Sequence, residues 1–356
     1  MTPLGAEIAA LIRQNGPIGV DRYMALCLGH PVHGYYRTRD PLGAKGDFTT
    51  APEISQMFGE LIGAWTAYAH GLMGQPDPLI LVELGPGRGT LMADALRALR
   101  AAAPGVRVRP HCVETSPVLR AAQERALTGT GAVWHDGIET LPPGPAILLA
   151  NEFFDCLPVR QFERRPNGWH ERQVGLGPQG GFLFGLAPEP TPGLDADGPE
   201  GALMSVPAAG LAVMRTVAQR IRAEGGMLLA IDYGHTRPGF GDTLQALAGH
   251  SYADPLAAPG EADITHHVDF AALARAATGV GAQVHGPVDQ GDFLFALGLR
   301  PRAERLKVRA TEAQAAEIER AVARLTDPGR GGMGSLFKVL AVSGPSLGPL
   351  PGFPEV

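Results

Sequence analysis

The chain has 356 residues, more than one domain usually contains, which predicts an elaborated core or a core with a sizeable insertion. The formal net charge of -6 and the lack of any long run of Lys or Arg disfavour a nucleic-acid partner. The three cysteines form no CxxC pair, so we expect neither a disulfide framework nor a metal site.

The start of the chain shows no secretory or transit signal. No segment reaches the roughly 20 apolar residues that a membrane span requires, so no membrane insertion is expected. Lysines are rare among the 30 basic residues, a skew that is typical of GC-rich bacterial genomes. These observations predict a cytoplasmic protein of bacterial origin.

The first part of the chain has the apolar spacing of helices. Residues 4–14 and 18–28 repeat this spacing, and a loop over 30–52 is dense in Gly, Pro, Tyr and Asp. A long, largely apolar helix is predicted over 53–73, just after a proline. We therefore assign residues 1–76 to an N-terminal helical and lid region.

From residue 79 the pattern changes to strands that alternate with helices. The predicted strands are 79–84, 106–114, 132–135, 146–150, 227–232 and 336–342, and the predicted helices are 90–100, 117–126, 268–278, 291–299 and 311–325. This order is typical of a buried parallel sheet with helices on both faces, so we expect an α/β, doubly wound, mainly parallel fold.

Two stretches interrupt the alternation. About 75 residues separate the fourth and fifth strands, too many for a simple crossover, and their alternating patterns predict a β-rich insertion at about 159–207. We place a second insertion at about 234–310, so that the core spans 77–343. The Pro-rich tail, 344–356, is expected to be ordered on the surface or frayed.

A glycine-rich turn follows the first core strand, with glycines at Gly85, Gly87 and Gly89. Glycine permits positive φ and close approach of the backbone to a ligand, and the amides at the next helix N-terminus can face a polar group such as a cofactor carboxylate. A dinucleotide motif needs a further glycine where Thr90 stands, and a P-loop needs Gly-Lys-Ser/Thr. A turn used only for packing is the remaining alternative.

Polar residues also follow the other predicted strands. Glu83 stands at the end of the first core strand, and Glu114 at the end of the second can accept both hydroxyls of an adenosine ribose. Asp136 lies just past the third strand, where it can reach an adenine amine, and Asn151 follows the fourth. We predict that these four residues and the three glycines bind the cofactor. For Glu114 the alternative is a solvated strand-end residue.

Several segments together resemble a known family. They are Gly46–Ser55, Glu83–Thr90, Asn151–Pro158, Ile231–Gly234 and Asp263–Phe270. Through them the chain is similar to the MidA-like S-adenosylmethionine-dependent methyltransferases, whose mitochondrial members include an arginine methyltransferase of complex I assembly. The resemblance implies a class I methyltransferase fold, S-adenosylmethionine as cofactor, and methyl transfer to an arginine of a respiratory complex I subunit, in support of assembly.

Carboxylates are the candidate acceptor residues, because a guanidinium is bound bidentately by such groups. Arginine methyltransferases, which this chain resembles, place a glutamate loop after the fourth strand, so Glu152 is our first choice and Asp155 our second. Both can instead brace the loop. Asp47, in a loop expected to cover the cofactor as a lid, and Asp232, after the fifth strand, complete the set, although Asp232 also fits an exposed turn. Glu53 fits the first turn of its helix.

Two other functions stay open. An assembly chaperone would bind a partner subunit through the N-terminal helices and the β-rich insertion and keep the cofactor as a structural ligand. An NAD-linked oxidoreductase is weakened by the missing third glycine. The expected partner is a protein substrate, with a homodimer as an open assembly. His30 and His33 have metal-like spacing, but nothing completes a site, so we expect loop or cap roles.

Overall fold

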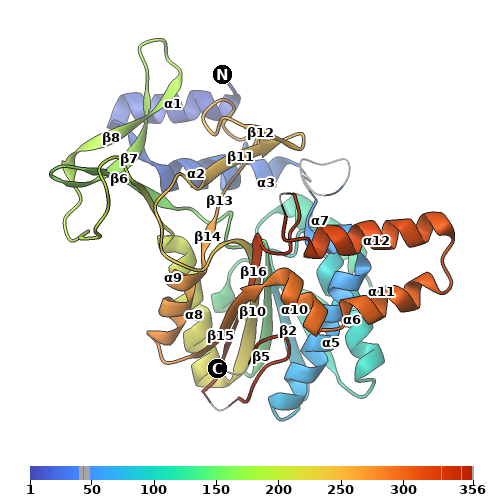
Figure 1. The fold of residues 1–356 in the computed structure, drawn as a ribbon. Helices are drawn as coiled ribbons and strands as arrows, with labels where there is room; N and C mark the ends of the chain where they lie inside the picture. Colours follow the sequence, from blue (N-terminus) through green and yellow to red (C-terminus); the bar gives the residue numbers. More distant parts are fainter. Residues whose placement is uncertain (40–42, 44–48, 330, 346, 355–356) are drawn as a thin grey trace. The chain divides into compact units, whose positions relative to one another are not determined.

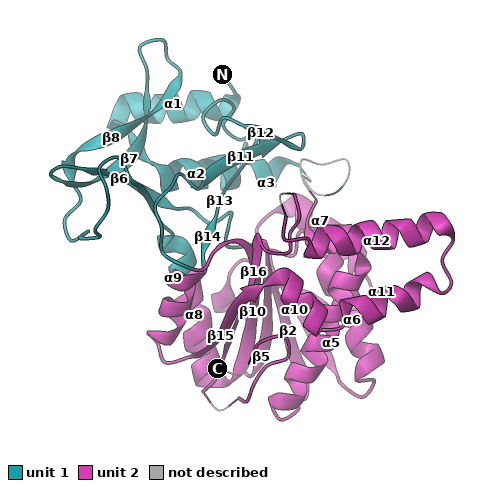
Figure 2. Ribbon diagram, in the orientation of Figure 1, with its two compact units in different colours: residues 1–48, 154–212, 237–269 teal, residues 49–153, 213–236, 270–356 magenta. Residues whose placement is uncertain are grey.

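The computed structural model of the protein describes residues 1–39, 43, 49–329, 331–345 and 347–354. The chain divides into two compact units (Figure 2). Unit 1 contains residues 1–48, 154–212 and 237–269, and unit 2 contains residues 49–153, 213–236 and 270–356.

Unit 2 contains a sheet in the order β15-β16-β10-β5-β2-β3-β4 (Figure 1). Its strands are β2 (Leu79–Leu84), β3 (Val108–Val113), β4 (Val133–His135), β5 (Ala146–Asn151), β10 (Gly226–His235), β15 (Gln283–Asp289) and β16 (Phe337–Ser343). The five strands from β4 to β10 are parallel, β16 is antiparallel to β10, and β15 is antiparallel to β16. Every residue of β2 and of β5 is buried, as expected for strands covered on both faces.

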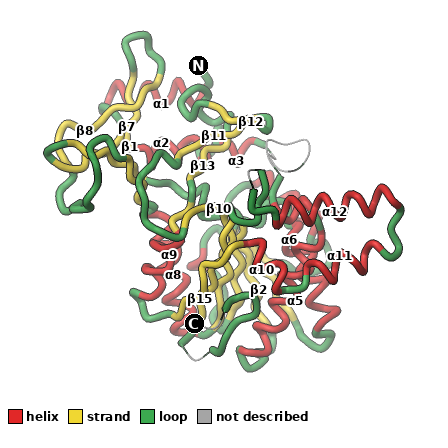
Figure 3. The backbone as a smooth tube through the Cα atoms, in the orientation of Figure 1, coloured by secondary structure: helices red, strands yellow, loops and turns green. Residues whose placement is uncertain are grey.

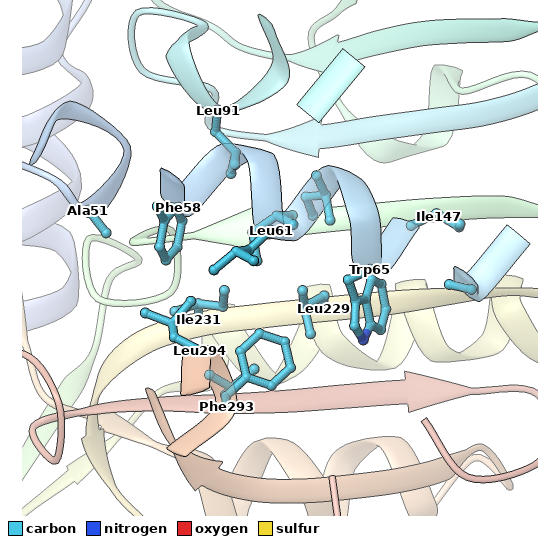
Figure 4. Packing of buried hydrophobic residues seen from close by; sticks show 14 of the residues in the cluster. Ala51, Phe58, Leu61, Trp65, Leu91, Ile147, Leu229, Ile231, Phe293 and Leu294 are labelled. Atoms are coloured by element: carbon cyan, nitrogen blue, oxygen red, sulfur yellow. The ribbon is translucent and has the colours of Figure 1, made fainter. Parts of the chain in front are cut away.

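Helices accompany this sheet on both faces. They are α4 (Ala51–Ile54), α5 (Gln56–Leu72), α6 (Thr90–Ala102), α7 (Pro117–Ala126), α8 (Ala208–Glu224), α9 (Phe270–Thr278), α10 (Gln290–Ala296), α11 (Leu299–Lys307) and α12 (Glu312–Thr326), with a 3-10 turn, η1, at Ile138–Thr140. Of these, α4, α11 and α12 pack on other helices of the unit. Figure 4 shows Phe58 and Trp65 of α5 in one buried cluster with Ile147 of β5 and Leu229 of β10. Helices α8 and α9 lie on the other side of the sheet (Figure 1). The doubly wound, mainly parallel α/β fold is thus confirmed.

The strand order reverses between β2 and β5. The chain adds β3 and β4 on one side of β2 and then places β5 and β10 on the other side. Loops after two such strands run toward opposite faces, and ligands of open α/β sheets bind at this point, outside the carboxyl ends of the strands. The glycine turn after β2 and the acidic segment after β5 therefore lie where the fold favours a ligand.

Unit 1 contains the N-terminal helices and the inserted strands (Figure 2), and Figure 3 shows its helices in red and its strands in yellow. Its elements are α1 (Pro3–Asn15), β1 (Ile18–Gly19), α2 (Val20–Gly29), α3 (Tyr35–Thr38), β6 (Arg160–Arg165), β7 (Gly168–Leu176), β8 (Phe182–Pro190), β9 (Leu203–Val206), β11 (Leu244–Ala248), β12 (Ser251–Ala253), β13 (Asp263–His266) and β14 (Val268–Asp269). One antiparallel sheet has the order β1-β7-β6-β9, with β8 also on β7, and a second has the order β12-β11-β13. The N-terminal helical extension and the β-rich insertion are therefore confirmed.

Several elements differ from the prediction, among them α11 and the strands β11 and β12, which were not predicted. Helix α8 was not predicted, although Met214, Val217 and Ile221 are buried on one of its faces at helical spacing. Strand β15 was also missed, because the Gly286-Pro287 pair falls inside it and shifts its register against β16. The helix predicted over 53–73 is divided at Ser55, whose extended backbone ends α4 and whose hydroxyl caps α5.

The boundaries of the two units differ from the predicted domain boundaries. Residues 49–76 belong to unit 2, since α5 packs so closely on α6 that a Cβ on Gly63 would lie 2.5 Å from the carbonyl oxygen of Ala95. Residues 270–310, which were predicted as part of an insertion, also belong to unit 2 because they contain α9 and β15, which pack on or pair with the sheet.

Candidate functional site

The turn after β2 is built from three glycines with positive φ. Gly85, Gly87 and Gly89 have φ values of 61°, 56° and 84°, and Gly89 occupies the N-cap of α6 in the left-handed conformation. A Cβ on Gly85 would lie 3.0 Å from the ring of Phe153, so this backbone and the segment after β5 come close together. Residues with side chains would be strained in these conformations and would fill the space beside the turn.

Glu83 lies beneath the first turn of α6. Its side chain is buried (3% exposed) and accepts a hydrogen bond from the backbone amide of Met92, and burial raises its pKa to about 8. Among the described residues no partner reaches its Oε2 atom. A buried carboxyl oxygen without a partner is costly, which indicates that a ligand or water supplies one.

Glu114 follows β3 and is enclosed by donors. Its Oε1 accepts from the amide of Ser116 (2.7 Å) and its Oε2 from Nε2 of Gln123 (3.1 Å), while Arg120 donates to its backbone carbonyl (2.7 Å). Burial raises the pKa of Glu114, and these donors act against that shift. The side chain is only 8% exposed, so the interpretation as a solvated strand end is wrong.

Asp136, after β4, is paired with a cation. Its Oδ1 accepts from the guanidinium of Arg120 at 2.6 Å, and 85% of its side chain is exposed. The same arginine donates to the carbonyl of Glu114, so it connects the ends of β3 and β4. The contact with an adenine amine expected from the sequence stays a prediction.

Asn151 is the last residue of β5, and Glu152, which follows it, has an unusual backbone conformation. Glu152 has a φ of 49°, a conformation that costs a non-glycine residue free energy and is found most often at functional sites. Its Oε1 accepts from the amide of Ala51 (3.0 Å) and from Nδ2 of Asn151 (3.1 Å). Within the described part of the chain, Oδ1 of the buried Asn151 has no partner.

Asp232 of β10 is fully buried. Its two carboxylate oxygens accept from the amides of Phe153 (3.1 Å) and Tyr233 (2.9 Å), and so connect the ends of β5 and β10. The alternative of an exposed turn residue is therefore wrong. The observed contacts support a bracing role for this carboxylate.

The two remaining acidic candidates are Asp155 and Asp47. Asp155 belongs to unit 1, where it is buried and its backbone carbonyl accepts from the amide of His266 at 3.0 Å. Burial, and after it the charges of Asp263, Cys156 and Asp155, raises the pKa of Tyr36, whose hydroxyl donates to Asp263 at 2.8 Å. Asp47 lies outside the described residues, whereas residues 49–53 of the predicted lid are described and lead into α4.

Two residues that were not predicted for the site, Glu53 and Gln123, also contact it. Glu53 of α4 accepts a hydrogen bond from the hydroxyl of Thr90 and lies 3.7 Å from the guanidinium of Arg88, so its carboxylate reaches the glycine turn. Gln123 of α7 contacts both the turn and Glu114. The sequence does contain a signal for Gln123, because it is a polar residue four positions after the buried Leu119, on the face of α7 that is otherwise apolar.

His30 and His33 lie together in unit 1. Their rings are stacked, and each Nε2 lies 3.3 Å from a carboxylate oxygen of Glu7. Among the described residues, no group of three or more His, Cys, Asp and Glu side chains is arranged to bind a metal ion. Nor is any described helix long and apolar enough to cross a membrane.

Comparison with known proteins assigns a chemistry to this arrangement. A family model described as an S-adenosyl-L-methionine-dependent methyltransferase matches residues 61–288. Among curated proteins, the arginine methyltransferase NDUFAF7 homolog of Drosophila melanogaster mitochondria is 38% identical over 95% of this chain and 84% of its own length. The human mitochondrial arginine methyltransferase NDUFAF7 is 37% identical over 88% of this chain and 77% of its own.

A solved structure matches nearly the whole chain. A COG1565 superfamily protein from Burkholderia thailandensis, crystallised with S-adenosyl-homocysteine, superposes with a TM-score of 0.83 and 29% identity, over 98% of this chain and 93% of that one. S-adenosylmethionine is accordingly the cofactor of this chain and the enzyme class is methyltransferase, as the sequence predicted. The chain belongs to the family of S-adenosyl-L-methionine-dependent methyltransferases that also contains the NDUFAF7 proteins.

Proposed function

We propose that this methyltransferase modifies an arginine side chain of a protein, a subunit of respiratory complex I, and thereby supports assembly of that complex. The names of the curated relatives support the arginine acceptor. The observation that carries the proposal is Glu152, whose carboxylate is positioned by a left-handed backbone at the point where the strand order reverses. A carboxylate there can bind the planar donors of a guanidinium.

The residues around the turn fit the methionine part of S-adenosylmethionine. Leu149 of β5 pairs with Glu83, and Asn151 is two residues further on, so Glu83 and Asn151 occupy the same face of the sheet. Glu83 Oε2 and Asn151 Oδ1 are both buried acceptors without a partner among the described residues, as a bound ammonium group would require. We assign the α-carboxylate to the turn of Gly85, Gly87 and Gly89 at the N-terminus of α6.

The nucleoside part is assigned to the ends of β3 and β4. The carboxylate of Glu114 accepts from the amides of Ser116 and Thr115 and from Nε2 of Gln123, and a carboxylate has about four lone-pair sites, so acceptor capacity remains for the ribose hydroxyls. Asp136 is assigned to the adenine amine, with Arg120 fixing its position.

The cofactor, when bound, supplies a methyl group already activated by its sulfonium. The protein therefore needs to align the attacking nitrogen and favour its reactive form rather than move many protons. Glu152 is our first candidate for orienting the guanidinium, with Asp155 and Asp47 as further candidates and Asp232 as a brace for the end of β10 beside Phe153. The charge of a carboxylate also localises positive charge away from the attacking nitrogen.

A labelling experiment tests the acceptor. The purified chain is incubated with tritiated S-adenosylmethionine and complex I subunits of the same organism, and labelled sites are mapped by mass spectrometry. Methylation of one arginine supports the proposal, and label on other residue types or on no subunit contradicts it. Calorimetry with S-adenosyl-homocysteine against NAD, run on the same sample, separates failure of the acceptor from failure of cofactor binding.

Two further expectations belong to this proposal. One is a bacterial cytoplasmic location, although the curated relatives are named as mitochondrial proteins. The other is a homodimer, which light scattering would support with a mass near twice the 37.3 kDa of one chain. A mass equal to that of one chain would contradict the homodimer but not the proposed methyl transfer.

A further inference from the structure

Gln123 of α7 contacts three segments around the proposed cofactor site. Its Nε2 donates to the carbonyl oxygen of Gly87 (2.8 Å) and to Oε2 of Glu114 (3.1 Å), and its Oε1 accepts from Nε1 of Trp134 (2.8 Å). The glycine turn, the end of β3 and strand β4 are therefore connected through one amide. Both of its donor hydrogens have acceptors.

The position of Gln123 within α7 is otherwise suited to an apolar residue. The side chain is completely buried, and Leu119 and Leu127, four residues before and after it, are buried as well. A buried amide is costly unless its hydrogen bonds are made, whereas an apolar residue of similar size would have no such requirement. The contacts of Gln123 therefore explain its polarity better than the packing of the helix does.

The orientation of the Glu114 carboxylate depends on this amide. Ser116 binds one carboxylate oxygen and Gln123 binds the other, so the plane of the group is fixed from two sides. Helix α7 is also close to the turn, since a Cβ on Gly89 would lie 3.4 Å from the Cα of Gln123. The spacing between the turn and the carboxylate is thus set before a ligand arrives, which lowers the cost of binding.

We propose that Gln123 is a positioning residue for the cofactor, which couples the glycine turn to Glu114 so that the methionine part and the ribose of S-adenosylmethionine are bound together. The inference rests on the proposed assignment of Glu114 to the ribose. In this role Gln123 acts through Glu114 and Gly87 and does not contact the reacting atoms.

A double-mutant cycle tests this coupling. Calorimetry measures S-adenosyl-homocysteine binding to the unaltered protein, Glu114→Ala, Gln123→Met and the double variant. We expect Gln123→Met to weaken binding about tenfold when Glu114 is present, and less than about threefold when it is absent, because only the Gly87 contact is then lost. The inference would be overturned if Gln123→Met weakened binding by the same factor with and without Glu114, or if it left the affinity unchanged.

A matched control distinguishes positioning from general stability. Gln161 in unit 1 is also completely buried, and its amide donates to Ser205 and Asp242. Gln161→Met removes a comparable buried amide and should lower the melting temperature without changing the dissociation constant. A loss of affinity equal to that of Gln123→Met would assign both effects to stability and overturn the inference.

A second variant keeps the test open if Gln123→Met does not fold. Gln123→Glu has nearly the same size and keeps an acceptor for Trp134, but its carboxylate cannot donate to Gly87 or Glu114 and repels Glu114. Its loss of affinity should shrink when Glu114 is replaced by Ala, and an undiminished loss would overturn the inference. Full binding by Glu114→Ala alone would instead contradict the ribose assignment, and no binding by the unaltered chain would contradict the site.

Discussion

The two acidic side chains at the ends of β2 and β3 show how surroundings decide the properties of a carboxyl group. Glu83 accepts from a single backbone amide, and burial raises its pKa to about 8. Burial also raises the pKa of Glu114, but Ser116, Gln123 and the charge of Arg120 oppose the shift. At neutral pH and without a ligand, the protonated form of Glu83 therefore prevails, while Glu114 has donors that stabilise its anionic form.

The raised pKa of Glu83 makes the free energy of unfolding depend on pH. The folded protein retains the proton up to about pH 8, whereas the unfolded chain releases it near 4.5. The stabilising contribution is therefore complete below pH 4.5 and is lost as the pH rises toward 8. Glu83→Gln removes this dependence, so its stability relative to the unaltered protein should increase with pH by about 1.4 kcal/mol per unit within that range.

Urea unfolding at several pH values across this range measures the effect. Glu124→Gln, an exposed change on α7, is the control and should give a constant difference. Parallel pH profiles for Glu83→Gln and the unaltered protein would show that Glu83 does not keep its proton on folding.

Glu114→Ala tests the ribose assignment. The variant removes a charged acceptor of two hydrogen bonds, each worth roughly 1.5–3 kcal/mol, so S-adenosyl-homocysteine affinity should fall at least about tenfold. Glu139→Ala, an exposed acid of η1, should leave calorimetric binding unchanged. An unaltered dissociation constant for Glu114→Ala in a folded protein would place the ribose elsewhere.

Among the elements, β2 and α7 have strong local patterns and were predicted, whereas β15 and the break between α4 and α5 interrupt such patterns and were not predicted. The bounds of β2 and α7 agree with the prediction, since an apolar run before glycines and a Ser-Pro start are unambiguous signals. Strand β15 was not predicted because a Gly-Pro pair lies within it. The break at Ser55 was not predicted either, because it depends on a hydroxyl cap and the apolar spacing on both sides of Ser55 is helical. Helix α8 is an exception, because its buried residues Met214, Val217 and Ile221 have helical spacing although no helix was predicted there.

The turn between β2 and α6 acts as an element in its own right, and Gly87→Val tests it. A β-branched residue at a φ of 56° is strained by roughly 1–3 kcal/mol and places a side chain where the backbone has to approach the ligand. We expect S-adenosyl-homocysteine binding to be lost in calorimetry while the far-UV circular dichroism spectrum is kept. Gly105→Val, at a site with open space and no positive φ, is the control and should bind normally.

For the whole molecule, sequence reasoning identified the strand ends but not the partners of their side chains. The pairing of Asp136 with Arg120 and the bridge made by Gln123 depend on how α7 lies against β3 and β4, which no local pattern specifies. The same holds for the units, each of which combines three separate chain segments. Their boundaries follow from packing such as that of α5 on α6, and a linear division of the chain cannot represent it.

Glu152→Gln addresses the function of the whole molecule, because it separates catalysis from binding of a partner subunit. Glutamine keeps an acceptor for the amide of Ala51 and for Asn151, so cofactor binding and the fold should persist. Without the charge that a guanidinium requires, methyl transfer should fall on the order of a hundredfold, from about 3 kcal/mol. Tritium transfer measures the rate, and Glu189→Gln on the exposed edge of β8 is the matched control.

Complex I assembly, scored in a strain carrying Glu152→Gln, then distinguishes the two classes of function. An enzyme whose product is needed for assembly predicts that assembly falls together with methylation. A chaperone predicts normal assembly despite the lost methylation, because the surface that binds the subunit is unchanged and the cofactor still binds. Full methylation by Glu152→Gln would contradict only the choice of residue, and the same pair of measurements on Asp155→Asn would then test the next candidate, a buried acid in unit 1.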